Sequence, residues 1–251
     1  MLIKNYKFIF FVFAIILASI FLFNDSSIFI YNKNKEQTAN INGGIGDSNG
    51  YFTGGGGTNS ITGIICKNYN RRPIAVMMAN DPVARPLSGI SSADLIIEMP
   101  VITGSITRIL AFFVCNNPSE IGALRSARHD FIPLAMGFDA IFVHWGGSYF
   151  ALDKLDKGKV DNINALYNPF GTFYRKFGLP APHNGFTSYD RLWLASQKLG
   201  YRSESKFDGY FFTSYDKCDA CQNGRLAIDY SIPYNVYYDY NAVRNGYLRF
   251  R

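Results

Sequence analysis

Apolar runs separated by short polar turns dominate residues 73–144, and their lengths predict β-strands. The run over residues 73–80 is closed by Asp81-Pro82, which is typical of a buried strand leading into a turn. Runs over 93–99 and 106–115 are rich in β-branched and aromatic residues, so we expect them to pair as a hairpin. A fourth, short strand is expected over 139–144, where Gly146-Gly147 follows directly.

Helical spacing appears between and after these strands. Phe131, Leu134 and Ala135 predict a helix over residues 126–136 that ends near Gly137. Ser148 is expected to cap a helix over 149–155, and Ser188 to cap one that stops at Gly200. Because strands and helices alternate but a hairpin interrupts the series, we predict one α/β domain over 66–203, a mixed β-sheet with packed helices.

The pattern changes to aromatic β segments after about residue 203. These segments cover 210–213, 232–240 and 247–251, with turn signals at Asn223-Gly224 and Asn245-Gly246. We therefore expect a small β-rich region over 204–251. Its last strand runs to the final residue, so we interpret this region as incomplete.

The first 31 residues have the layout of a membrane anchor or a secretory signal. Lys4 and Lys7 precede an uncharged apolar run over residues 8–23, and no small-x-small cleavage site follows it. We favour an uncleaved anchor in the cell membrane over a cleaved signal, with the remaining chain outside the cytoplasm. Residues 32–65 are rich in Gly, Asn and Ser and predict a flexible tether.

Charge narrows the class of partner. The net charge is +6, and no block of Lys and Arg or basic helix stands out. This argues against nucleic acid and favours anionic lipid or a cell-wall polymer. The chain downstream of the tether is long enough to bury a substantial core.

The four cysteines are an even number in a chain that we expect to be exported, so two disulfides are plausible. Cys66 and Cys115 lie far apart in the sequence, whereas Cys218 and Cys221 are only three apart. We favour a local disulfide for this second pair. A zinc half-site or a redox pair stays open, although no second CxxC accompanies it.

Two arginines are candidates for anion binding. Arg125 and Arg128 are three residues apart, so on a helix both guanidinium groups would point to one side, as a phosphate or carboxylate requires. The alternative is that they pair with Glu98, Asp94 or Asp130 and only brace the fold. Three further polar residues in the same window complete the predicted ligand-binding set: Asp161, Asn162 and Asn184.

Acid–base chemistry would fall to Glu98, His144 and His183. His144 ends a predicted buried strand, where α/β sheets often place functional side chains, and His183 lies in a Pro-His-Asn loop. Either histidine would serve equally well as a hydrogen bonder that fixes a loop. Ser148 is a weak candidate nucleophile, and a metal site from both histidines and a carboxylate lacks diagnostic spacing. No serine-hydrolase elbow, HExxH or phosphate loop occurs, so we expect no cofactor and no metal.

Many of these segments, in this order, resemble one bacterial family, the YerB-like lipoproteins. The matching segments are 73–80, 84–89, 93–95, Glu98, 104–108, 121–128, 144–148, 161–163 and 182–184. The resemblance implies a membrane-attached α/β domain followed by a smaller β-rich domain, in a family linked to cell-wall synthesis and its penicillin-binding proteins. It carries no established catalytic residues. The lipid-anchor cysteine expected of a lipoprotein is missing from this sequence.

Two functional hypotheses follow. The first is an anchored binding or scaffold module that docks a cell-wall polymer or a penicillin-binding protein. The second is a hydrolase or transferase that acts on an envelope glycan or anionic polymer through an Arg/His/Glu cleft. We prefer the first, because the sequence shows recognition residues more plainly than an activated nucleophile.

Overall fold

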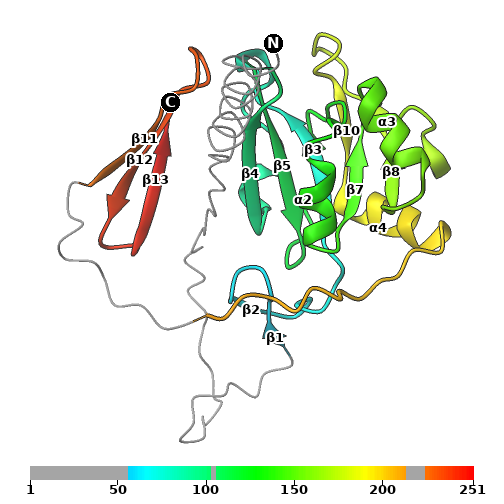
Figure 1. Ribbon diagram of the computed structural model, residues 1–251, viewed down its shortest axis with the longest axis horizontal. Coiled ribbons are helices and arrows are strands. Elements are labelled where there is room, and N and C mark those ends of the chain that lie inside the picture. Colours follow the sequence, from blue (N-terminus) through cyan, green and yellow to red (C-terminus); the bar gives the residue numbers. More distant parts are fainter. Residues whose placement is uncertain (1–55, 103–105, 213–223) are drawn as a thin grey trace, which may run out of the picture.

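A five-stranded mixed β-sheet forms the centre of the protein (Figure 1). The computed structural model describes residues 56–102, 106–212 and 224–251. The strand order is β4 (Leu95–Pro100), β5 (Thr107–Phe113), β3 (Ile74–Ala79), β7 (Ile141–His144) and β8 (Asn162–Asn164). β4, β5 and β3 pair antiparallel, whereas β3, β7 and β8 pair parallel. The predicted mixed sheet and its hairpin are thus confirmed.

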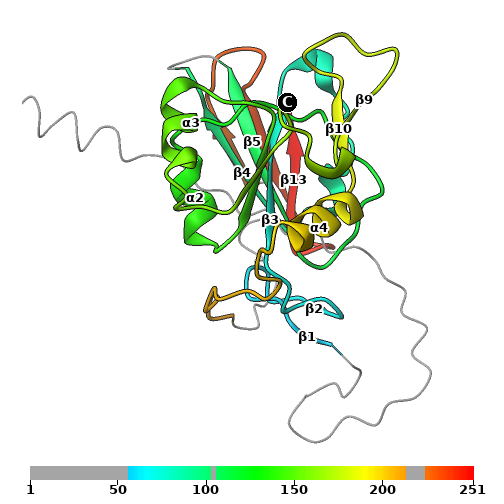
Figure 2. The ribbon, with the colours of Figure 1, turned by 90° about the vertical axis from the view of Figure 1, so that its right-hand side faces the viewer.

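Both faces of this sheet are covered by helices, which explains why its central strands are mostly apolar. Figure 2 shows α2 (Ile132–Gly137) and α3 (Tyr149–Asp156) on one face and α4 (Tyr189–Lys198) on the other. Phe112 and Phe142 pack with the first two helices. Phe113 and Val143, one residue along in each strand, pack with α4. Successive side chains of a strand point to opposite faces of the sheet, so each strand contributes side chains to the hydrophobic cores on both faces.

The helix caps follow the sequence closely, with one correction. Ser148 and Ser188 accept hydrogen bonds from the backbone N–H of Ala151 and Arg191 and begin α3 and α4, as expected. The predicted start of the preceding helix at residue 126 is wrong, because α2 begins only at Ile132. Proline fits the first turn of a helix but not its interior, so Pro133 excludes a helix that starts six residues earlier.

The described part of the α/β domain also contains a second, smaller sheet and three 3-10 turns. A second sheet has the order β6 (Ile121–Gly122), β10 (Gly185–Thr187), β9 (Tyr174–Arg175). A Cβ on Gly122 would lie 2.2 Å from the Phe186 ring, so only glycine allows β6 and β10 to approach this closely. Three 3-10 turns, η1 (Pro82–Ala84), η2 (Ile90–Ser92) and η3 (Pro169–Gly171), complete the loops.

The folded domain begins earlier than the sequence predicts. β1 (Gly57–Thr58) pairs with β2 (Ile65–Cys66), and Ile61 between them is buried in the main core. Residues 56–65 therefore belong to the folded domain and not to the predicted tether, of which residues 32–55 lie outside the described residues. Burial of the Ile61 side chain stabilises by roughly 1.5–3 kcal/mol and so helps to dock this segment.

A disulfide joins Cys66 to Cys115, across 49 residues of sequence. The second cysteine pair, Cys218 and Cys221, lies outside the described residues, as do the predicted anchor over 1–31 and the tether up to residue 55. Across 56–102, 106–212 and 224–251, none of the helices has both the length and the apolar character needed to cross a membrane.

Residues 203–212 run back across the α/β domain. The Tyr210 backbone N–H donates to Ser60 O, and its ring packs against Phe138 and Phe207. The strand predicted to begin at residue 210 is absent over 210–212, and residue 213 lies outside the described residues. Tyr210 and Phe207 therefore pack against Phe138 of the α/β domain instead of lying in a paired strand.

A three-stranded antiparallel sheet forms the C-terminal part, which confirms its β-rich character. Its order is β11 (Arg225–Ile228), β12 (Val236–Asn241), β13 (Gly246–Phe250). The predicted turn at Asn245-Gly246 joins β12 to β13, with Asn245 at a positive φ of 46°. Of the other predicted turn, Asn223 lies outside the described residues. Side chains from this sheet and from the segment before β12 reach the end of β3, where the polar groups described next gather.

Candidate functional site

Asp81 stands at the carboxyl end of the central strand β3, at the centre of a cationic group. Ala79 lies opposite Arg108 in the β3–β5 ladder, which puts the Arg108 side chain beside Asp81. Its Nη1 donates to Asp81 Oδ2 at 3.1 Å. The Arg125 backbone N–H donates to Met77 O, and this fixes Arg125 along the same strand end, with its Nη2 4.0 Å from Asp81 Oδ2.

Two further side chains complete this group. Nδ1 of His183 lies 3.8 Å from Asp81 Oδ2, and the charge of Arg128 acts on both Arg108 and Arg125. We call Asp81, Arg108, Arg125, Arg128 and His183 the Asp81 cluster. Two guanidinium groups thus lie within 4.0 Å of a single carboxylate, and Arg128 adds a third positive charge nearby.

The Asp81 cluster holds donors that no protein group satisfies. Nε of Arg108, Nε of Arg125 and Nδ1 of His183 are buried without a hydrogen-bond partner among the described residues. Arg108 is 4% exposed, so its guanidinium lies deep in the domain. Buried polar groups in native proteins are nearly always paired, and unpaired donors at one place therefore point to an acceptor that binds there.

The pKa values of Arg108, Arg125 and His183 in the Asp81 cluster are lowered, as crowding of buried positive charges requires. Burial lowers the pKa of Arg108, and the Arg125 guanidinium lowers it further, although Asp81 opposes the shift. Burial likewise lowers the pKa of Arg125, where Arg128 acts against Asp81. The pKa of His183 is lowered by burial and by Arg125. A bound anion would relieve this repulsion, whereas a bound cation would increase it.

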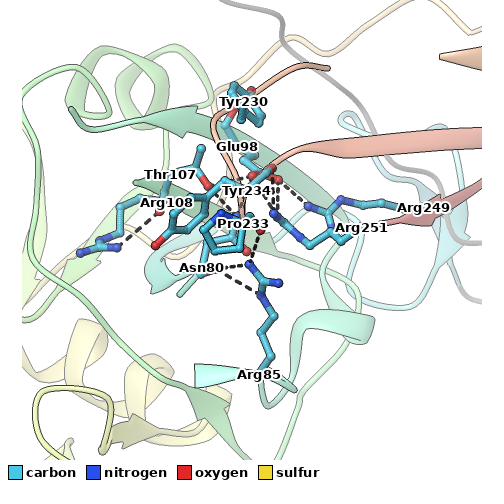
Figure 3. A network of polar contacts seen from close by, with 10 residues as sticks. All are labelled: Asn80, Arg85, Glu98, Thr107, Arg108, Tyr230, Pro233, Tyr234, Arg249 and Arg251. Atoms are coloured by element: carbon cyan, nitrogen blue, oxygen red, sulfur yellow. Dashed lines mark hydrogen bonds and ion pairs between the residues drawn. The ribbon is translucent and has the colours of Figure 1, made fainter. Parts of the chain in front are cut away.

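Glu98 lies next to this cluster and is fully engaged by protein groups (Figure 3). Its Oε1 accepts hydrogen bonds from Asn80 Nδ2 at 2.6 Å and from Thr107 Oγ1 at 2.8 Å. Nη2 of Arg249 donates to Oε2 at 2.5 Å, and Nη2 of Arg251 contacts both oxygens at 2.9 and 3.0 Å. A carboxylate with all its acceptor sites occupied is suited to holding the C-terminal sheet in place rather than to proton transfer.

Arg85 joins this second group through backbone carbonyls. Its Nη2 donates to Asn80 O at 2.6 Å and contacts Pro233 O at 3.5 Å. Burial lowers the pKa of Arg85, as do the charges of Arg251 and Arg249. We call Asn80, Arg85, Glu98, Thr107, Arg249 and Arg251 the Glu98 cluster.

Tyr234 connects the two clusters. Its hydroxyl donates to Asp81 Oδ1 at 2.9 Å, and its backbone oxygen accepts from Arg251 Nη1 at 2.9 Å. Figure 3 shows Tyr234 and Pro233 between Arg108 on one side and Arg249 with Arg251 on the other. The C-terminal sheet therefore borders the site as well as closing over Glu98.

His144 lies in a different environment. It ends β7 as predicted, but its ring is buried: Nδ1 is 2.7 Å from Gly146 O, and Nε2 is 3.2 Å from Asn162 Oδ1. These contacts and the stacked Phe142 ring fix the loop between β7 and α3. The arrangement matches the alternative in which this histidine is a loop-fixing hydrogen bonder.

The other predicted residues also have local structural partners. Asp161 forms an ion pair with Arg72. The Asn184 side-chain oxygen accepts from Arg175 Nη1 at 2.6 Å, and the Ser148 hydroxyl caps α3. Of the residues predicted from sequence, the structure thus brings Arg125, Arg128 and His183 together, places Glu98 in the adjoining cluster, and separates the rest.

Several residues of the site were not predicted from sequence: Asp81, Arg85, Arg108, Tyr234, Arg249 and Arg251. Two of them carried a usable signal. Asp81 directly follows an apolar run, at the strand end where α/β sheets place functional groups. Arg108 interrupts an otherwise apolar strand, and a charged side chain there needs a partner.

Burial of His144 makes the stability of the domain pH-dependent. Its pKa is lowered, mainly by burial, so the unfolded chain binds a proton more readily than the folded one. We expect the free energy of unfolding to fall as pH drops below 6.5, by at most about 1.4 kcal/mol per pH unit from this group. Urea unfolding between pH 7.5 and pH 5 measures it, and His144→Gln should flatten the profile. If the free energy of unfolding depends on pH equally in the wild type and in His144→Gln, then His144 is not the source of the pH dependence.

Comparisons with known proteins place the chain in a family. Residues 61–202 match the model of a family described as "Protein of unknown function (DUF3048) N-terminal domain". "Putative lipoprotein YerB" of Bacillus subtilis (strain 168) is 38% identical over 186 residues, which is 73% of this chain and 56% of that protein. The crystal structure of YerB from Bacillus subtilis matches with a TM-score of 0.68 and 35% identity, over 76% of this chain and 65% of the crystallised one.

The chain therefore spans little more than half the length of the curated relative that it matches. More than half of the chain lies within the family model, and the solved relative shares its mixed α/β architecture. This protein belongs to the YerB-like family, whose N-terminal domain is designated DUF3048.

Proposed function

We propose that this chain is an extracytoplasmic binding module, held at the cell membrane by its N-terminal segment, that recognises an anionic cell-wall polymer at the Asp81 cluster. The observation that carries the proposal is the pair of buried, unpaired donors on Arg108 and Arg125, with the unpaired Nδ1 of His183 beside them, around one carboxylate. A phosphate or carboxylate group would accept from these donors and offset the excess positive charge.

Two other observations support this assignment. The Bacillus subtilis relative is named as a lipoprotein, which is a membrane-attached class of protein. The sequence of this chain places an apolar run with two lysines before it at the N-terminus. Both are consistent with a domain that works close to the membrane surface, where cell-wall polymers are assembled.

The enzyme alternative has less support from the geometry. Its three acid–base candidates have separate partners: Glu98 holds two arginines, His144 is buried against Gly146 and Asn162, and His183 lies beside Asp81. General acid–base catalysis needs such groups within reach of one reacting atom. Binding requires only the donors that the Asp81 cluster provides.

The test is co-sedimentation of the full-length chain, in detergent, with purified cell walls before and after the anionic polymers are stripped from them. We expect binding to intact walls only. Arg125→Ala/Arg128→Ala should weaken it about 100-fold, since each charged hydrogen-bonding group contributes roughly 1.5 kcal/mol. The charge-matched control is Lys154→Ala/Lys159→Ala, on the exposed face and following turn of α3, which should bind as the wild type does.

Three outcomes would contradict the proposal. Equal loss in the lysine control would mean that only net charge matters. Full binding to stripped walls would point to the neutral glycan or its peptides. Retention by a penicillin-binding protein in the absence of walls, with no binding to the walls themselves, would make a protein the partner.

A further inference from the structure

The Asp81 and Glu98 clusters adjoin each other along the chain and in space. Asn80 and Asp81 are consecutive, so their Cα atoms lie about 3.8 Å apart, yet each belongs to a different cluster. Asn80 donates to Glu98, and Asp81 accepts from Arg108 and from the Tyr234 hydroxyl. Figure 3 shows this succession of polar groups from Arg108 through Tyr234 to Arg251.

The Asp81 and Glu98 clusters together hold more arginines than carboxylates. The six arginines are Arg85, Arg108, Arg125, Arg128, Arg249 and Arg251. The carboxylates that act on them are Asp81 and Glu98. Two clusters with three guanidinium groups and one carboxylate each leave an excess of four positive charges. One small anion fits one cluster and would leave the other unneutralised.

We propose that the two clusters form one continuous track for a linear polyanion with repeating phosphate groups, which runs from Arg108 past Tyr234 to Arg249. This inference rests on the proposed function and names the chemistry of its polymer. Each phosphodiester carries one negative charge and two oxygens that match the fork of a guanidinium group. Successive phosphates of one chain would neutralise the two clusters together.

The two ends of the track differ in accessibility. Arg108 is buried with an unpaired Nε, and its side chain is 5% exposed, so this end of the track offers a donor in the interior of the domain. The Arg249 side chain is 30% exposed and that of Arg251 is 13% exposed, so the other end is more accessible to solvent. A polymer would therefore approach along the C-terminal sheet, with one of its phosphates at the unpaired donors of the Asp81 cluster.

Arg85 is the most informative residue for a test. Its side chain donates to the backbone carbonyls of Asn80 and Pro233, so Arg85→Ala leaves no carboxylate without its partner. In contrast, Arg249→Ala/Arg251→Ala removes both cations from Glu98 and can loosen the C-terminal sheet. If both variants weaken polymer binding, the loss comes from the removed ligand contacts, because Arg85→Ala keeps the ion pairs of Glu98 that dock the C-terminal sheet.

The experiment is calorimetric titration of the full-length chain in detergent with inorganic phosphate, a short poly(glycerol phosphate) and a polyglutamate of equal charge. We expect the phosphate polymer to bind at least about 100-fold more tightly than inorganic phosphate, as linked contacts do. Arg85→Ala and Arg249→Ala/Arg251→Ala should weaken polymer binding about 10-fold or more and leave inorganic phosphate unchanged. Arg125→Ala/Arg128→Ala should weaken both ligands, and Lys154→Ala/Lys159→Ala neither.

The possible failures are distinguishable. If the polymer binds no more tightly than inorganic phosphate, or if Arg85→Ala and the double variant bind it as the wild type does, the Glu98 cluster only docks the C-terminal sheet and the track is overturned. Equal affinity for polyglutamate overturns the assignment to phosphate. If neither inorganic phosphate nor either polymer binds, the proposed function fails together with the track.

Discussion

Replacing Asp81 with asparagine is expected to lower the free energy of unfolding by about 3–5 kcal/mol in a buffer without multivalent anions. The carboxylate is the ion-pair partner of the buried Arg108 and lies near Arg125 and His183, and it also accepts the Tyr234 hydroxyl. Asparagine keeps the shape of the side chain but removes its charge. The cations would then be left buried without compensation, which destabilises more than loss of the pair itself.

Urea unfolding is the measurement, because urea is uncharged and does not screen the site. Added phosphate should restore part of the loss and should stabilise Asp81→Asn more than the wild type, since the anion then replaces the missing carboxylate. Asp239→Asn is the matched control: its ion pair with Arg225 lies on the exposed C-terminal sheet and should matter little.

A destabilised Asp81→Asn variant that phosphate does not stabilise would show that the cluster only braces the fold. The two possibilities that the sequence leaves open for Arg125, anion binding or structural bracing, therefore give different results in one series of unfolding curves. The partner that would do the bracing is Asp81, and not Glu98, Asp94 or Asp130 as the sequence suggests.

Four of the five strands of the sheet could be predicted from the sequence because each is a separate apolar run, whereas β8, with one apolar residue between two asparagines, could not. The hairpin of β4 and β5, the strand β3 and the caps at Ser148 and Ser188 all rest on local signals, which involve neighbours in the chain. The predicted start of α2 is wrong for a local reason too, because helical spacing alone does not reflect the position of Pro133, which fits only the first turn of a helix.

The site could be predicted only in part, because its residues meet through long-range contacts. Arg125, Arg128 and His183 belong to it, and their residue types were informative on their own. Arg249 and Arg251 reach Glu98 across 151 and 153 residues, through docking of a separate sheet that no local pattern describes. The sequence predicts Asp81 only as a turn residue, since Asn-Asp-Pro is a strong turn signal whatever else the side chain does.

Removing the Cys66–Cys115 disulfide is expected to lower the free energy of unfolding by about 4 kcal/mol. The bond closes a loop with a sequence separation of 49, and in the chain-entropy model a cross-link over that length restricts the unfolded state by this amount. It also fixes β2 to the segment after β5, so that Ile61 stays in the core. We would compare Cys66→Ala/Cys115→Ala with the wild type by urea unfolding under oxidising conditions.

Cys218→Ala/Cys221→Ala provides the control, since it removes the same number of cysteines. These two residues are only three apart, so any bond between them closes a short loop and restricts the unfolded chain far less. A reductant should destabilise the wild type and leave Cys66→Ala/Cys115→Ala almost unchanged. If instead this variant unfolds at the wild-type urea concentration, the hydrogen bonds around Cys115, from Asn68 to its carbonyl and from its N–H to Asp94, hold the N-terminal segment without the cross-link.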